Sequence, residues 1–148
     1  MLNPILKEDF AAIISRVTPT FKAMAGSHLL ITGAAGFIGS YLVDLFVYAN
    51  EHYFDKPCMI NGVDNWVAAS RTPTLTSDVM LGSIILGNYD WIIHAASIAS
   101  PKIYMAKPLE TIAANVDLTR KVLEEARAKY TKGVLHMSSS EVYGDPMV

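Results

Sequence analysis

Short apolar runs alternate along the chain with longer stretches in which apolar residues recur every three or four positions. The short runs are typical of strands buried on both faces of a sheet, and the recurring pattern is typical of amphipathic helices. The pattern predicts helices over residues 3–17, 36–50 and 108–129, and strands over residues 28–32, 58–63, 90–94 and 134–137. A further short strand is expected near residues 74–78, and a loop over residues 97–107.

Strands that alternate with helices form parallel sheets with right-handed crossovers. We therefore expect an α/β fold with a doubly wound parallel sheet over residues 28–148, preceded by a helical extension over residues 1–27. Asn3 is placed to cap the first helix, and Thr18-Pro19 is expected to end it. We expect this helix to pack on the fold, because most amphipathic helices do so.

A glycine-rich turn, TGAAGFIG over residues 32–39, joins the first predicted strand to the next helix. Gly33 permits a tight turn, Gly36 lets a pyrophosphate approach the backbone, and Gly39 lets the helix pack closely on the strand. The unpaired N–H groups at the positive end of that helix suit the pyrophosphate. Strand, turn and helix in this order predict a dinucleotide-binding turn.

Polar residues also fall at the predicted carboxyl ends of strands, where ligands bind in such sheets. Asp64 can accept hydrogen bonds from both ribose hydroxyls of adenosine and would repel a 2′-phosphate, which favours NAD over NADP. A solvated turn residue is the alternative, and Arg71 keeps NADP open. Asp78 could bond the adenine amino group with help from the backbone of Val79, or could be a loop or cap aspartate.

Small residues, Ala95 and Ala96, follow the next strand and leave room for a flat cofactor. The preceding His94 is expected to be a hydrogen-bonded core histidine rather than a catalyst. Asn115 is a poor helix former inside the predicted helix 108–129. It can bond the loop of the neighbouring strand or the cofactor, and we expect mainly structural support.

Three serines and a glutamate, residues 138–141, follow the last predicted strand. Serine hydroxyls can donate to a substrate oxygen, and a glutamate in a closed site can move a proton. A serine-rich turn with a capping glutamate is the alternative, and the position at the carboxyl end of a strand leaves the two interpretations balanced. A hydrolase is not indicated, because no Gly-x-Ser-x-Gly elbow surrounds these serines.

The composition narrows the range of partners. The net charge of −2 argues against nucleic acid, whose phosphates need a basic face, and no apolar run is long enough to span a bilayer. The histidines are scattered and the single Cys58 has no partner at ligand spacing, so no metal site is expected. One cysteine and no signal-peptide pattern favour a cytoplasmic protein.

Taken in order, these motifs resemble the extended short-chain dehydrogenase/reductase enzymes that act on nucleotide sugars. The resemblance covers about residues 28–146 and leaves the first helix outside. Two stretches, HAASIASP over residues 94–101 and SSEVYGDP over residues 139–146, look most like UDP-glucuronate decarboxylases. The related dTDP-glucose 4,6-dehydratases have Asp-Glu where this chain has Ser140-Glu141.

The resemblance implies a Rossmann fold, NAD as cofactor, a nucleotide-sugar substrate and a homodimer built through helices such as 108–129. It implies oxidation of the sugar at C4 by NAD, decarboxylation or dehydration, and re-reduction. Ser139 would bond the C4 hydroxyl, and Glu141 would act near the neighbouring carbon. The implied cofactor-binding residues are Gly33, Gly36, Phe37, Ile38, Gly39, Asp64, Asn65, Asp78, Val79, Ala95, Ala96, Asn115 and Ser138.

The catalytic tyrosine and lysine of the family form a Tyr-x-x-x-Lys pair beyond the Ser-Glu segment, and no tyrosine of this chain has a lysine four residues later. We therefore expect the chain to be the NAD-binding portion of an enzyme, truncated before that pair and the substrate domain. Alone, it should bind NAD without turnover. The alternatives are a non-catalytic NAD-binding or regulatory module, a half completed by a second chain, and part of a nucleotide-sugar 4-epimerase.

Overall fold

The computed structural model describes residues 3–66, 79–82 and 87–145 of the chain. Helices and strands alternate as the sequence pattern predicts. The elements are α1 (Pro4–Met24), β1 (His28–Thr32), α2 (Phe37–His52), β2 (Met59–Val63), β3 (Val79–Gly82), β4 (Trp91–His94), α3 (Pro101–Ala106), α4 (Pro108–Ile112), a π-helical segment (Ala113–Asp117), α5 (Leu118–Ala128), β5 (Gly133–His136) and a 3-10 turn (Ser140–Tyr143).

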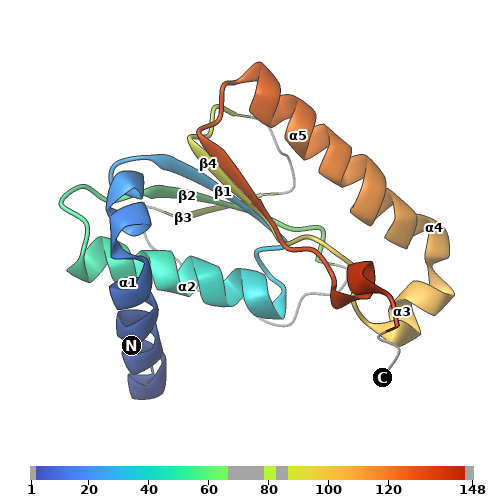
Figure 1. The fold of residues 1–148 in the computed structure, drawn as a ribbon, viewed down its shortest axis with the longest axis horizontal. Coiled ribbons are helices and arrows are strands. Elements are labelled where there is room, and N and C mark those ends of the chain that lie inside the picture. The colour runs from blue at the N-terminus through green and yellow to red at the C-terminus, as the bar shows by residue number, and fades with distance from the viewer. Residues whose placement is uncertain (1–2, 67–78, 83–86, 146–148) are drawn as a thin grey trace.

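The strands form one parallel sheet in the order β3-β2-β1-β4-β5 (Figure 1). The order reverses between β1 and β4, and Thr32 at the end of β1 pairs with both Val63 of β2 and His94 of β4. The expected doubly wound parallel sheet is confirmed. Its topology places the ligand crevice at the carboxyl ends of β1 and β4.

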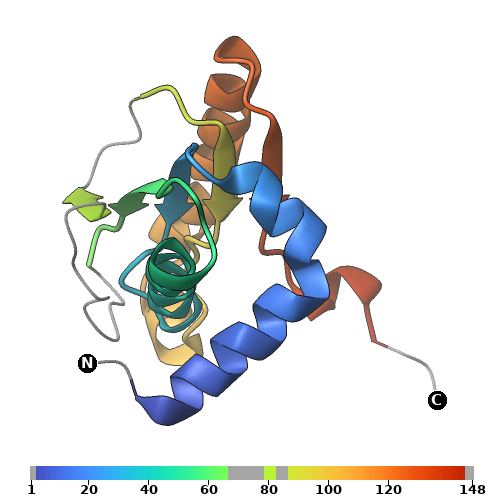
Figure 2. The same cartoon turned by 90° about the vertical axis from the view of Figure 1, so that its left-hand side faces the viewer.

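Each face of the sheet has its own apolar core. Leu29 and Ile31 of β1 face α1 and α2, whereas Leu30 between them packs with Ile92 and with Val122 of α5. Figure 2 shows α1 and α2 together on one side of the sheet and α5 on the other. Near-continuous apolar strands are the consequence of burial on both faces, which is why the strands were readable from the sequence.

The first helix continues past its expected end. Thr18-Pro19 does not end it; instead α1 kinks at Val17, where φ is −117° and ψ is 18°, and runs on to Met24. The second half is held by burial, because Phe21 stacks on Phe46 of α2 with ring centroids 5.0 Å apart. The packing of aromatic rings therefore outweighs the helix-breaking effect of one proline.

Two further predictions need correction. The loop expected over residues 97–107 contains the short helix α3, whose first residue is Pro101, a favourable position for proline. The predicted helix 108–129 is interrupted by the π-helical segment. The strand expected near residues 74–78 lies outside the described residues.

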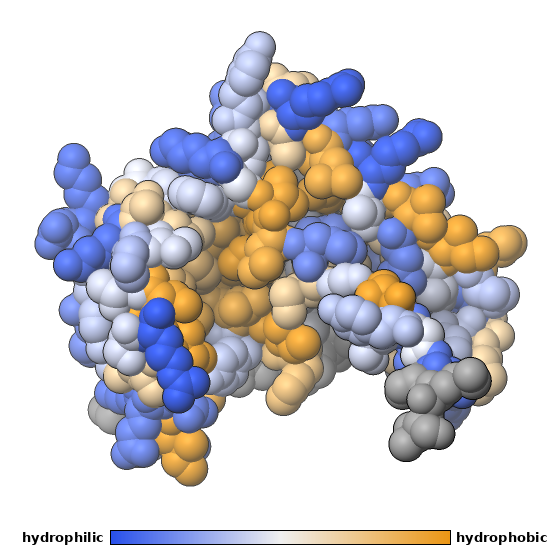
Figure 3. Space-filling model, viewed as in Figure 1, coloured by the Kyte–Doolittle hydropathy of each residue, from blue (hydrophilic) through white to orange (hydrophobic). Residues whose placement is uncertain are grey.

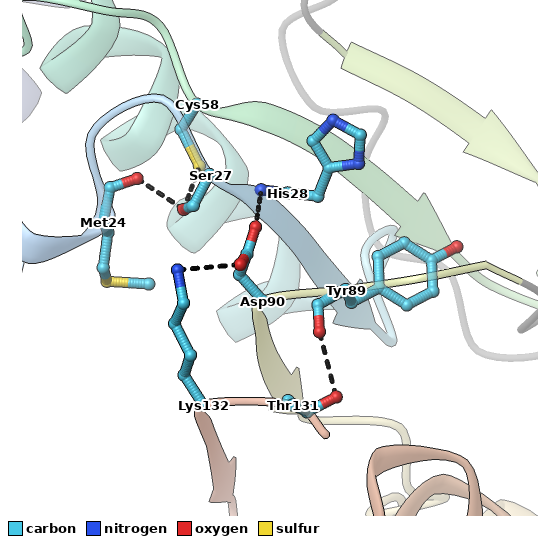
Figure 4. A network of polar contacts seen from close by, with 8 residues as sticks. All are labelled: Met24, Ser27, His28, Cys58, Tyr89, Asp90, Thr131 and Lys132. Atoms are coloured by element: carbon cyan, nitrogen blue, oxygen red, sulfur yellow. Dashed lines mark hydrogen bonds and ion pairs between the residues drawn. The ribbon is translucent and has the colours of Figure 1, made fainter. Parts of the chain in front are cut away.

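A polar network joins the amino ends of the strands, at the edge opposite the predicted site (Figure 4). The Asp90 carboxylate accepts the His28 N–H at 2.9 Å and pairs with the Lys132 ammonium at 2.8 Å. The bond to Lys132 and the His28 N–H lower the pKa of Asp90. Nearby, the Ser27 hydroxyl bonds the Met24 carbonyl. Asp90 thus joins the starts of β1 and β5 to β4.

Apolar side chains remain exposed on one side of the molecule. Figure 3 shows them over β5 and along α4–α5. The exposed residues there are Leu109, Ile112, Val116, Leu123, Leu135 and Met137. β5 is the outer strand of the described sheet, so its edge and this apolar surface lie side by side.

Candidate cofactor-binding site

The glycine turn lies where β1, β2 and the segment after β4 converge. The Gly33 N–H donates to the Val63 carbonyl at 2.7 Å. Gly33 has a φ of +72°, and a Cβ there would lie 2.7 Å from the Ala95 carbonyl oxygen. A Cβ on Gly39 would lie 1.9 Å from the Gly33 carbonyl oxygen, which no side chain can tolerate. The predicted turn and the predicted close packing of the helix are both present.

The helix α2 begins directly after this turn, at Phe37. Among the described residues no side chain caps α2, whose N-cap is Gly36. The N–H groups of a first helical turn have no partner within the helix and carry the positive end of its dipole. Phe37 is 80% exposed and Ile38 is also exposed, so neither side chain is needed for the core. This end of α2 is suited to an anion such as a pyrophosphate.

Asp64 lies directly beside the glycine turn. One of its carboxylate oxygens accepts the Ala35 N–H at 2.9 Å, and the other accepts the Trp66 N–H at 2.7 Å. Asn65 is the residue between Asp64 and Trp66 in the sequence. A carboxylate has about four acceptor positions, so both oxygens retain capacity for ribose hydroxyls. The structure thus brings together the two predicted features, the turn and the acid.

His94 is buried at the end of β4 and bonded through both ring nitrogens. Nδ1 lies 2.6 Å from the Thr32 hydroxyl, and Nε2 lies 2.9 Å from the Thr119 hydroxyl of α5. The Thr32 hydroxyl also accepts the Ala96 N–H at 3.2 Å. Burial, and then the charge of His136, lower the pKa of His94 to about 4. The expectation of a core histidine is confirmed, and its neutral ring braces the segment that carries Ala95 and Ala96.

Asn115 contacts the loop after β4. Its side-chain oxygen accepts the Ser97 hydroxyl at 2.8 Å, and it lies in the π-helical segment. Single π-helical turns inside α-helices are frequent at functional sites. The contact matches the expected supporting role, whereas contact with the cofactor stays a prediction.

The serine-rich segment is exposed at the end of β5. The Ser139 hydroxyl accepts the Glu141 N–H at 3.2 Å and caps the 3-10 turn. This contact fits the alternative interpretation, in which the serines serve only to form a turn, for one of the three serines. A capping hydroxyl still has its own proton to donate. The chemical roles of Ser139 and Glu141, and the cofactor contact of Ser138, stay predictions.

The structure describes a third strand, β3, at residues that follow the strand expected near 74–78. Val79 is the first residue of β3 and pairs with Ile60, so it lies toward the amino side of the sheet. Gly82, paired with Val63, is the residue of β3 at the carboxyl edge. Asp78 lies outside the described residues. Residues 79–82, to which the sequence analysis assigned no element, pair with β2 as β3.

The described residues were compared with two other kinds of feature, a metal site and a membrane-spanning helix. Within them no group of three or more His, Cys, Asp or Glu side chains could hold a metal ion. None of their helices combines the length and apolar character needed to cross a membrane.

Residues 29–147 match the NAD dependent epimerase/dehydratase family. The chain belongs to this family. It is 37% identical over 125 residues to UDP-glucuronic acid decarboxylase 6 of Arabidopsis thaliana, which covers 81% of the chain and 36% of the relative. The chain therefore spans about a third of the length of this relative. The family match begins at residue 29, after α1.

Solved structures of the family share the fold. A UDP-N-acetylglucosamine 4-epimerase from Methanobrevibacter ruminantium M1, in complex with UDP-N-acetylmuramic acid, is 25% identical with a TM-score of 0.70; the match covers 84% of this chain and 42% of that chain. The enzyme WbmF of Bordetella bronchiseptica, in complex with NAD+, is 22% identical with a TM-score of 0.66. That match covers 80% of this chain and 38% of the WbmF chain. The expected Rossmann fold is confirmed.

Trp66 adjoins the candidate site and was not singled out from the sequence. It follows Asp64-Asn65, its N–H is bound by the Asp64 carboxylate, and its backbone has a φ of +61°. The signal that could have found it was an aromatic residue two positions after the predicted ribose-binding acid.

Proposed function

We propose that the chain binds NAD across the carboxyl ends of β1, β2 and β4. The shared carboxylate of Asp64, which already bonds the Ala35 N–H of the glycine turn, is the observation that carries the proposal. The adenosine ribose would lie on Asp64, and the pyrophosphate on the amino end of α2 near Gly36. The small side chains of Ala95 and Ala96 leave space on the β4 side.

The whole protein is proposed to act on a nucleotide sugar. NAD held by Asp64 and the glycine turn would supply reversible oxidation at sugar C4, and the C4 hydroxyl proton would pass to the tyrosine of the family's Tyr-x-x-x-Lys pair, which this chain does not contain. Ser139 would donate a hydrogen bond to the C4 oxygen while its own oxygen accepts the Glu141 N–H. Glu141, exposed beside it, would move a proton near the neighbouring carbon.

Decarboxylation is the reaction that we favour. Ser140 has no acidic proton to offer where the dehydratases have an aspartate, so elimination of water lacks its acid. The similarity to UDP-glucuronic acid decarboxylases supports the same choice. Epimerisation at C4 is the second candidate, since the structural neighbours include 4-epimerases. The proposed setting is the cytoplasm, and the proposed assembly is a homodimer.

Calorimetry with the 148-residue chain tests the proposed cofactor. NAD should bind to the wild type, and Asp64→Ala should weaken it by about tenfold or more, as expected for lost hydrogen bonds to a charged group. NADP should bind more weakly than NAD, because its 2′-phosphate meets the Asp64 charge. Asp55→Ala is the matched control, an exposed aspartate before β2 at the other edge of the sheet. A folded wild-type chain that binds no NAD would refute the proposal.

A further inference from the structure

The helix α1 lies outside the part of the chain that matches the family, yet it belongs to the core. The family match begins at residue 29, whereas α1 ends at Met24. Phe10 of α1 is 0% exposed and lies in the same buried cluster as side chains of β1 and α2. The family's cofactor-binding fold therefore does not account for α1, and its role follows from its own contacts.

α2 is covered by the sheet on one face and by α1 on another. Tyr41, Leu45 and Tyr48 recur at i, i+4 and i+7, the spacing of one helix face. The ring of Phe10 lies between the two tyrosines, 4.9 Å from Tyr41 and 5.7 Å from Tyr48 between centroids. α2 is buried at every residue over 43–49, which a sheet on one face alone cannot achieve. Figure 2 shows α1 beside α2 on the same side of the sheet.

The kink at Val17 divides α1 into two halves that contact different parts of α2. Phe21, in the second half, lies 5.0 Å from Phe46 and 5.8 Å from Phe54 between ring centroids. Both partners lie in or beyond the carboxyl-terminal half of α2. Phe10, in the first half, also has two ring contacts and is also buried, but it reaches further toward the amino end of α2.

Tyr41 is the residue through which α1 reaches the amino end of α2. It is the fifth residue of the helix and lies five positions after Gly36. Phe10 packs edge-to-face on its ring at an interplanar angle of 69°. Burial, and then the negative charge of Asp9, raise the pKa of Tyr41, so Asp9 of α1 also faces it. The first turn of α2 is thus held from the sheet by the glycine turn and from the opposite side by α1.

We propose that the first half of α1 positions the amino end of α2 for the pyrophosphate of the cofactor. The inference rests on the proposed NAD site. Asp9 and Phe10 lie outside that site and act through Tyr41, so they are positioning residues. Binding groups keep their geometry only where a surrounding layer of side chains locks them. When the first half of α1 leaves α2, the N–H groups of the first turn are free to shift and NAD binds more weakly.

Two matched substitutions test the proposal by calorimetry and thermal unfolding. Phe10→Leu and Phe21→Leu each remove a buried ring that has two aromatic partners. Both should lower the unfolding temperature. Phe10→Leu should also weaken NAD by about threefold to tenfold, the factor that lost aromatic contacts can supply, whereas Phe21→Leu should keep the wild-type affinity. Equal weakening by both variants, or none by Phe10→Leu, would overturn the proposal.

Hydrogen exchange of the wild-type chain tests the same coupling without any substitution. Coupling between two places in a protein is reciprocal, so saturating NAD should slow the exchange of the backbone amides of residues 6–16. Residues 18–24, beyond the kink, are the internal control and should change less. General stabilisation by a ligand would slow both halves together. An unchanged first half, or equal slowing of both halves, would count against the proposal.

Failure of this inference differs from failure of the NAD site. If the wild type binds NAD while Phe10→Leu keeps its affinity, α1 has no positioning role and the site stands. If the folded wild type binds no NAD, both are overturned. Circular dichroism verifies the fold of each variant, and if Phe10→Leu does not fold, the exchange of the wild type decides.

Discussion

The hydroxyl of Thr32 lies 2.6 Å from Nδ1 of His94, where the neighbouring strands β1 and β4 end. Both residues are buried, and each makes a second hydrogen bond. The Thr32 hydroxyl accepts the Ala96 N–H, and Nε2 of His94 bonds the Thr119 hydroxyl of α5. This chain of bonds joins the two strands that flank the ligand crevice to the helix that covers them. The glycine turn begins at the residue after Thr32, so the base of the proposed site is fixed by a buried histidine that is bonded through both ring nitrogens.

His94 should make the fold sensitive to acid. Its pKa of about 4 in the fold lies below the value of about 6.5 of an unfolded histidine. As the pH falls, the unfolded chain takes up the proton first, so this stabilisation is complete above about pH 6.5 and is lost by about pH 4. The full difference is about 3 kcal/mol. Urea unfolding of the wild type at pH 7 and pH 4.5, compared with His94→Asn, measures it.

The control for this prediction is His52→Gln, an exposed histidine at the end of α2. It should keep the wild-type pH dependence, whereas His94→Asn should be less stable at pH 7 and flatter with pH. An equal loss of stability with acid in wild type and His94→Asn would show that other groups cause it.

The glycines at positions 36 and 39 should separate binding from folding. Gly39→Ala places a Cβ 1.9 Å from the Gly33 carbonyl oxygen and should cost about 3 kcal/mol or more. At Gly36 the nearest such atom is the same oxygen at 3.1 Å, a contact that a small shift relieves. Gly36→Ala should therefore fold but lose NAD affinity. Thermal unfolding and calorimetry on both variants give the comparison.

Two results with the Gly36→Ala and Gly39→Ala variants would contradict these predictions. If Gly36→Ala binds NAD as the wild type does, the pyrophosphate does not approach that residue. If Gly39→Ala is as stable as the wild type, the turn is not packed as the structure has it.

Asp90 should affect stability without affecting the site. Removing its carboxylate frees the His28 N–H and the Lys132 ammonium at the amino ends of the strands. Asp90→Ala should cost about 1 kcal/mol, because the ion pair is partly exposed and most of the loss is the hydrogen bond. The affinity for NAD should not change, since the proposed site lies at the opposite edge of the sheet. A weakened affinity in a folded Asp90→Ala would indicate coupling across the sheet.

The sequence predicted what depends on short-range pattern. The apolar runs located β1, β2, β4 and β5 because both faces of these strands are buried, and the glycine turn followed from the steric demands at Gly33 and Gly39. The position of Asp64 beside the turn followed from the parallel arrangement of the strands. All of these are consequences of a few neighbouring residues.

Contacts between distant segments were beyond the sequence pattern. The continuation of α1 through Pro19 depends on the stacking of Phe21 on Phe46, which only the folded core reveals. The conformation of Trp66 depends on the carboxylate of Asp64, two residues away but turned back by the loop. The cap formed by Ser139 fits the structural interpretation of this serine, and its chemical role stays a prediction.

The proposed homodimer should form through the exposed apolar residues of α4–α5. Leu109, Ile112 and Val116 recur at helical spacing, and all are exposed. Hydrophobic residues gathered on one surface are typical of a contact with another chain. Ile112→Glu would place a charge within that contact and should shift the chain to a monomer in sedimentation velocity. Lys121→Glu, an exposed substitution on α5, is the control for added negative charge. A wild-type chain that is monomeric at every concentration would refute this interface for the 148-residue chain.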